Sequence, residues 1–154
     1  MKNFEFLLCI LLCVLPCVFT ENKPEHIEYV AGIMKITPQN LLKCLTKVNM
    51  DLETIYDLAR SFLHDDGLSS QENVTKVSCF VACISNKNGV LVNSKIVPEK
   101  IVKLAKQIGE DEQSLTLLSR TAKECKEQVS SRTDDCDIML YFSRCVVRGM
   151  NHRE

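Results

Sequence analysis

Cysteine is the residue type in this sequence with the most distinctive chemistry, because its thiol can form a disulfide, ligate zinc or act as a nucleophile. The chain of 154 residues contains nine cysteines and three histidines. After the apolar N-terminal segment that contains Cys9, Cys13 and Cys17, only Cys79 and Cys83 have the close spacing of a zinc-ligand pair, and the three histidines His26, His64 and His152 are scattered along the chain. The spacing favours disulfides, and we predict neither a metal site nor a cofactor.

Three of the nine cysteines lie in an apolar segment near the N-terminus. Ten consecutive apolar residues run from Phe6 to Leu15, after Lys2 and before Pro16. This run is too short to span a bilayer and is typical of a secretory signal peptide, which it fits better than the alternative, an N-terminal membrane anchor. We place cleavage after Thr20, so residues 1–20 are the predicted signal peptide and residues 21–154 the mature, secreted domain.

Six cysteines remain after this cleavage, an even number in a small chain from an oxidising compartment, which predicts three disulfides. On a helix, Cys79 and Cys83 would point in parallel from one face and could not bond to each other. Cys136 and Cys145 would lie about 13 Å apart along a continuous helix. Six cysteines can pair in 15 ways. Three of these contain the first excluded pair, three the second and one contains both, so ten pairings remain.

Apolar residues recur with a helical period over most of the mature chain. Only the segment 89–97 shows the alternation of a strand, and Pro38 is expected to break the first helical region. The last helix contains the apolar run 138–142, which predicts burial on most sides. Helices are expected over residues 25–36, 38–47, 51–62, 74–85, 98–108, 111–129 and 135–148, with Asp51 as the cap of the third, Pro98 in the first turn of the fifth, and Gly109 and Gly149 as the stops of the fifth and seventh.

Composition excludes several functional classes. The formal net charge is −1, which gives no basis for binding nucleic acid. Apolar residues make up 45% of the chain, as in a globular domain rather than a disordered segment. No second apolar run predicts stable membrane insertion. The sequence has no H-E-x-x-H, no G-x-S-x-G and no phosphate-binding glycine loop, and disulfides would consume the thiols, so we predict no enzyme and no catalytic residue.

The mature cysteines form the pattern C-x34-C-x3-C-x41-C-x10-C-x8-C, beginning at Cys44. In order and spacing this pattern resembles the six-cysteine odorant-binding proteins of insects, which include the pheromone-binding proteins. The resemblance implies an all-α fold of about six helices around an internal apolar cavity, held by three disulfides. It also implies one of the ten pairings: Cys44–Cys83, Cys79–Cys136 and Cys125–Cys145.

The same resemblance implies a secreted carrier for olfaction. Such a protein would bind and solubilise odorants, pheromones or related lipids and transport them through aqueous extracellular fluid. A membrane receptor and a second copy of the chain are further candidate partners. The alternatives are a non-sensory lipid carrier and a helical interaction or signalling protein, in haemolymph or gland secretions.

The carrier interpretation predicts residues that contact the ligand. They share inward, mostly apolar positions on several helices, where each could equally be ordinary core: Ile55, Phe62, Val77, Phe80, Val81, Ile84, Leu104, Ile108, Leu115, Leu118, Leu140, Tyr141 and Phe142. Tyr141 or Tyr56 could offer a hydroxyl group to a polar end of the ligand. Asn73 begins an Asn-Val-Thr sequon and is a candidate N-glycosylation site.

Overall fold

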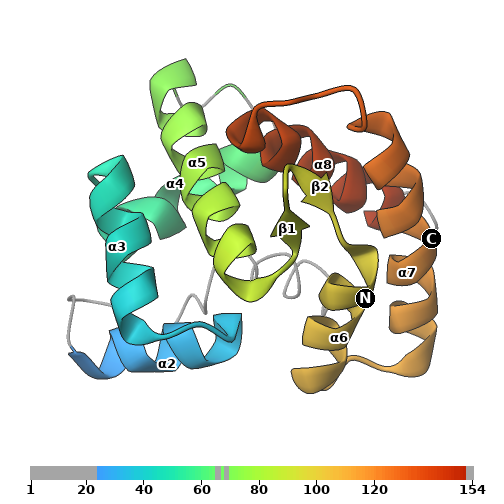
Figure 1. Ribbon diagram of the computed structural model, residues 1–154, viewed down its shortest axis with the longest axis horizontal. Helices are drawn as coiled ribbons and strands as arrows, with labels where there is room; N and C mark the ends of the chain where they lie inside the picture. The colour runs from blue at the N-terminus through green and yellow to red at the C-terminus, as the bar shows by residue number, and fades with distance from the viewer. Residues whose placement is uncertain (1–23, 65–66, 68–69, 152–154) are drawn as a thin grey trace.

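The computed structural model describes residues 24–64, 67 and 70–151, and the predicted signal peptide and His152 lie outside them. These residues form seven helices and one short hairpin, which confirms the predicted all-α class (Figure 1). In chain order the elements are α2 (Pro24–Met34), α3 (Pro38–Val48), α4 (Leu52–His64), α5 (Gln71–Asn88), β1 (Leu91–Val92), β2 (Lys95–Ile96), α6 (Pro98–Gln107), α7 (Glu112–Gln128) and α8 (Asp135–Asn151). The described helices exceed the implied six because the chain breaks before Pro38 and separates α2 from α3.

Local sequence signals set where several helices begin. The side chain of Asp51 accepts a hydrogen bond from the backbone N–H of Thr54 at 2.7 Å, and Asp111 accepts one from Ser114 at 2.8 Å. Each aspartate therefore satisfies a backbone donor that the first turn of its helix leaves free. Both helix starts were predicted, and so was Pro98 in the first turn of α6.

The hairpin lies where the sequence alternates between 89 and 97. Leu91 pairs with Ile96 in antiparallel register, and both side chains are buried, whereas Val92 is exposed. The two residues of the turn, Asn93 and Ser94, have φ angles of 49° and 59°. Such left-handed positions suit a tight hairpin turn, so the alternating pattern here does mark strands.

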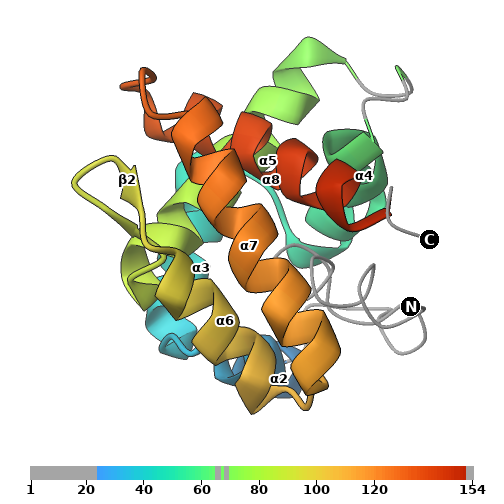
Figure 2. The same ribbon diagram turned by 90° about the vertical axis from the view of Figure 1, so that its right-hand side faces the viewer.

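Three disulfides join the helices in pairs. Cys44–Cys83 connects α3 to α5, Cys79–Cys136 connects α5 to α8, and Cys125–Cys145 connects α7 to α8. These are the pairs that the family resemblance implied. Figure 1 shows the result, with α5 between α3 on one side and α8 on the other. Figure 2 shows α6 lying beside α7, with which it is in contact, so that α6 extends the wall that α7 and α8 form.

The end of α8 differs from the prediction. We expected the helix to stop at Gly149, but it continues to Asn151. A Cβ atom added to Gly149 would lie 2.6 Å from the Cγ2 atom of Thr121 on α7. Glycine here permits close packing of α8 on α7 and does not terminate the helix. By contrast, Gly109 has a φ of 92° just beyond α6, where it was expected as a stop.

We expect Gly149→Ala to lower the free energy of unfolding by about 1–3 kcal/mol, because the new methyl group would overlap the Thr121 side chain. Urea denaturation measures this change. Gly32→Ala is the matched control, since an added Cβ in that part of α2 meets nothing within 4 Å. It should stabilise the protein by up to about 1 kcal/mol.

The double variant Gly149→Ala, Thr121→Ser removes the methyl group that would be struck and should recover part of the loss. A Gly149→Ala protein as stable as the original would show that α7 and α8 are not packed this closely.

Candidate functional site

The structure brings most of the predicted ligand-contacting residues into one continuous apolar cluster. Ten of them are buried: Ile55, Phe62, Val77, Phe80, Val81, Ile84, Leu115, Leu118, Leu140 and Phe142. Leu104 and Ile108 are partly buried and pack against the same cluster. The twelve residues, hereafter the buried set, come from α4, α5, α7, α8 and the region of α6. Five separate stretches of sequence therefore supply one apolar interior.

Tyr141 does not belong to this set. Its side chain is 42% exposed, and the guanidinium carbon of Arg132 lies 3.6 Å from the centre of its ring. This cation–π contact holds the tyrosine on the outer side of α8, although Leu140 and Phe142 on either side of it are buried. Of the two tyrosines considered as polar contacts, Tyr56 is the one that packs against the core.

Two buried hydroxyl groups were missed by reasoning from the sequence. The side-chain oxygens of Ser85 on α5 and Thr121 on α7 are buried and have no hydrogen-bond partner among the described residues. Ser78, seven residues earlier and so on the same side of α5, differs because its hydroxyl donates to the carbonyl of Val74 at 2.6 Å. A buried hydroxyl without a partner can bond a polar atom of a bound molecule. Ser85 could have been found from the sequence, because it is a serine on the otherwise apolar side of the helix predicted over residues 74–85.

Arg144 links α8 to the last turn of α4. Its Nε atom donates a hydrogen bond to the carbonyl of Phe62 at 2.7 Å, and an Nη atom lies 3.5 Å from the carbonyl of Ser61. A guanidinium group is favourable at the C-terminal end of a helix, where backbone carbonyls lack partners within the helix. The contact fixes the end of α4 and thereby the position of the buried Phe62 ring.

The link between α6 and α7 carries two carboxyl groups whose pKa values are shifted in opposite directions. Burial raises the pKa of Glu110, and the charge of neighbouring Asp111 adds to the rise. The hydrogen bond from the backbone N–H of Ser114 lowers the pKa of Asp111. One oxygen of Glu110 is also buried without a partner among the described residues. The fold therefore disfavours a charge on Glu110 and favours one on Asp111.

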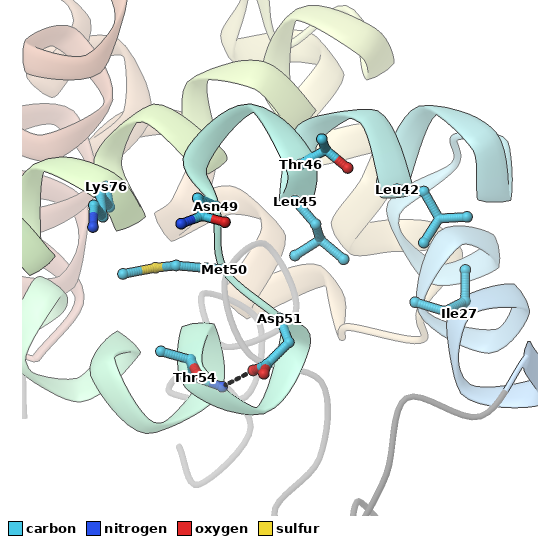
Figure 3. Close-up of a pocket in the computed structure, with 9 residues that line it drawn as sticks. All are labelled: Ile27, Leu42, Leu45, Thr46, Asn49, Met50, Asp51, Thr54 and Lys76. Atoms are coloured by element: carbon cyan, nitrogen blue, oxygen red, sulfur yellow. Dashed lines mark hydrogen bonds between the residues drawn. The ribbon is translucent and has the colours of Figure 1, made fainter.

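A separate groove of about 670 Å³ lies between α2, α3, α4 and α5 and is open to solvent (Figure 3). It is lined by Ile27, Leu42, Leu45, Thr46, Asn49, Met50, Asp51, Thr54 and Lys76. None of these residues belongs to the buried set, and none was predicted as a site residue.

Two features are absent from the described residues, a metal-binding cluster and a membrane-spanning helix. Within them, no group of three or more His, Cys, Asp or Glu side chains is arranged to hold a metal ion. Among the same residues, no helix has the length and apolar character needed to cross a bilayer.

Replacing Glu110 with Gln should raise stability at neutral pH. Because the folded-state pKa is raised, the wild-type carboxyl favours the fold only while protonated, and this contribution is lost as the pH rises through that pKa. The gain should therefore vanish in acid, which urea denaturation at two pH values measures. Asp111→Asn is the control of opposite sign: its carboxylate stabilises the fold at neutral pH and loses this effect as the pH falls. A loss of stability in Glu110→Gln at pH 7 would contradict the assignment.

Comparison with known proteins places the chain in a family. The model of the PBP/GOBP family matches residues 28–149, a range that includes all six bonded cysteines. Neither a search of curated proteins nor a search of solved structures gave a match. The match covers well over half of the sequence, and the chain therefore belongs to the PBP/GOBP family of insect odorant- and pheromone-binding proteins, which bind small hydrophobic ligands.

Proposed function

We propose that this protein is a secreted carrier that binds small hydrophobic molecules and transports them through aqueous extracellular fluid. Odorants, pheromones and related lipids are the ligand class. The observation that carries the proposal is the buried set, in which twelve apolar side chains from five regions of the chain meet in one cluster. Family membership supports the same function.

The covalent crosslinks support a carrier in physical terms. A domain that encloses a ligand gives up packing contacts that a solid core would have. The disulfides close chain separations of 39, 57 and 20 residues. On the loop-entropy model, each stabilises the fold by roughly 3–4 kcal/mol by restricting the unfolded chain. Together they are comparable with the whole net stability of a small domain, about 5–15 kcal/mol.

The polar groups near the apolar interior favour a ligand with at least one oxygen or nitrogen atom. Ser85 and Thr121 provide buried hydroxyls without partners among the described residues. A ligand atom that bonds either hydroxyl would remove the cost of leaving it unsatisfied, roughly 1–3 kcal/mol. Such a contact would also orient an otherwise apolar molecule.

A substitution that distinguishes a ligand pocket from a solid core is Leu118→Phe. If Leu118 lines a pocket, the larger ring fills space that the ligand would use, and the affinity for a fluorescent apolar probe should fall about tenfold. Stability should change little. The chain has no tryptophan, so probe fluorescence is measured against a low background.

Leu41→Phe is the matched control. Leu41 is also fully buried, but it lies on α3 and outside the buried set. Over-packing there should cost about 1–3 kcal/mol of stability and leave the probe affinity unchanged. If Leu118→Phe behaves like Leu41→Phe, the buried set is solid core. A folded protein that binds no apolar probe would favour an interaction or signalling function.

Secretion is tested by expressing the full chain in insect cells. We expect the protein in the medium, with an N-terminus at Glu21 in Edman sequencing, because the apolar run before Thr20 has the length of a signal peptide. Retention in the membrane fraction with Met1 intact would contradict this.

The same sample tests Asn73, which is partly exposed in the first turn of α5. A glycan there would add mass that N-glycosidase removes and that Asn73→Gln lacks.

A further inference from the structure

The open groove has the dimensions of a ligand site. Its volume of about 670 Å³ falls within the range of roughly 300–1,000 Å³ that small-molecule sites occupy. Its walls come from α2, α3 and α4, the link between α3 and α4, and one side chain of α5. It shares no lining residue with the buried set, so occupation of one would not use the contacts of the other.

The two ends of the groove differ in polarity. Figure 3 shows Ile27 and Leu42 at one end and Lys76 at the other, with Leu45, Asn49 and Met50 between them. Leu42 is the exposed leucine of α3: 48% of its surface is accessible, whereas Leu45 is 6% exposed. A ligand chain that covered Leu42 would remove apolar surface from water, which is favourable at roughly 25 cal/mol per Å². This difference in polarity between the two ends of the groove fits an amphiphile with one apolar tail and one polar head.

The lining residues carry two charges of opposite sign, which lie apart in the groove. The carboxylate of Asp51 accepts the backbone N–H of Thr54 and lies beside α4, away from Lys76 (Figure 3). A polar head at the Lys76 end of the groove would therefore meet the positive charge. The ammonium group of Lys76 lies 2.8 Å from one oxygen of Glu72, whose side chain is 74% exposed. Such a solvent-exposed pair is weak, and an ammonium has three N–H donors. Lys76 can therefore donate to a second anion.

We propose that the groove is a second binding site, for single-chain carboxylates of the fatty-acid class. The carboxylate lies at Lys76 and the exposed side-chain amide of Asn49, and the hydrocarbon chain runs over Met50 and Leu45 to Leu42. This site goes beyond the carrier function proposed for the interior, because it uses different residues.

The test compares dodecanoate with dodecanol, which has the same chain and no charge. Titrations are followed in ¹H–¹⁵N NMR spectra of the disulfide-bonded protein. Dodecanoate should shift the amides of Thr46, Asn49 and Lys76 and bind this site about fivefold more tightly than dodecanol. Lys76→Gln should abolish that preference. Lys103→Gln, an exposed lysine of α6, is the matched control and should leave it unchanged.

Two further variants separate this site from the interior. Leu42→Ser should lower the affinity of the groove for both dodecanoate and dodecanol, because it removes an apolar side chain that contacts the hydrocarbon tail. Leu118→Phe should leave the groove shifts intact even where it weakens binding of the apolar probe. Groove shifts in a protein that binds no apolar probe would overturn the carrier proposal alone.

Three results would overturn the groove proposal: dodecanoate shifts confined to residues of the buried set, equal affinity for the acid and the alcohol, or an unchanged preference in Lys76→Gln. If a variant fails to fold, the groove proposal is still tested by comparing the affinities of the original protein for dodecanoate and dodecanol.

Discussion

Two cysteines on one helix, four residues apart, constrain α5 from both sides. Cys83 bonds α3 and Cys79 bonds α8, so α5 cannot shift relative to either neighbour without straining a covalent bond. The same helix carries four members of the buried set, from Val77 to Ile84. Since α8 is in turn bonded to α7, four helices form one crosslinked series. The positions of most interior side chains depend on this series.

Features that depend on a few neighbouring residues could be predicted from the sequence. Asp51 was predicted as a cap, and α7 was predicted to begin near Asp111, because the interaction that defines a cap spans only three residues. Gly149 was misread because a glycine can end a helix or admit a neighbouring one. Only the position of Thr121, 28 residues earlier in the chain, decides between these functions. Tyr141 was misplaced for a similar reason, since its exposure depends on Arg132 from the preceding loop.

In the candidate sites, too, features set by neighbouring residues could be predicted and features set by distant residues could not. Helical periodicity identified the buried positions of α4, α5 and α7, because it reports which side of a helix avoids water. It does not report whether that side faces a ligand or other side chains, since both environments favour the same residues. The groove could not be found in this way. Periodicity separates the exposed Leu42 from the buried stripe of α3 that begins at Leu41, but it does not report which other segments meet Leu42 to form a groove.

The disulfides also divide the described helices into two groups, those that are crosslinked and those that are not. Helices α2, α4 and α6 contain no cysteine, so each can move away from the interior without stretching a crosslink. Hydrogen bonds from Arg144 are one attachment of α4 to α8, and such bonds can break and re-form. Local opening draws on weakly held elements. The crosslinked helices α3, α5, α7 and α8 are therefore held together by covalent bonds, whereas α4, which carries the buried Ile55 and Phe62, has no disulfide and is held by packing and hydrogen bonds.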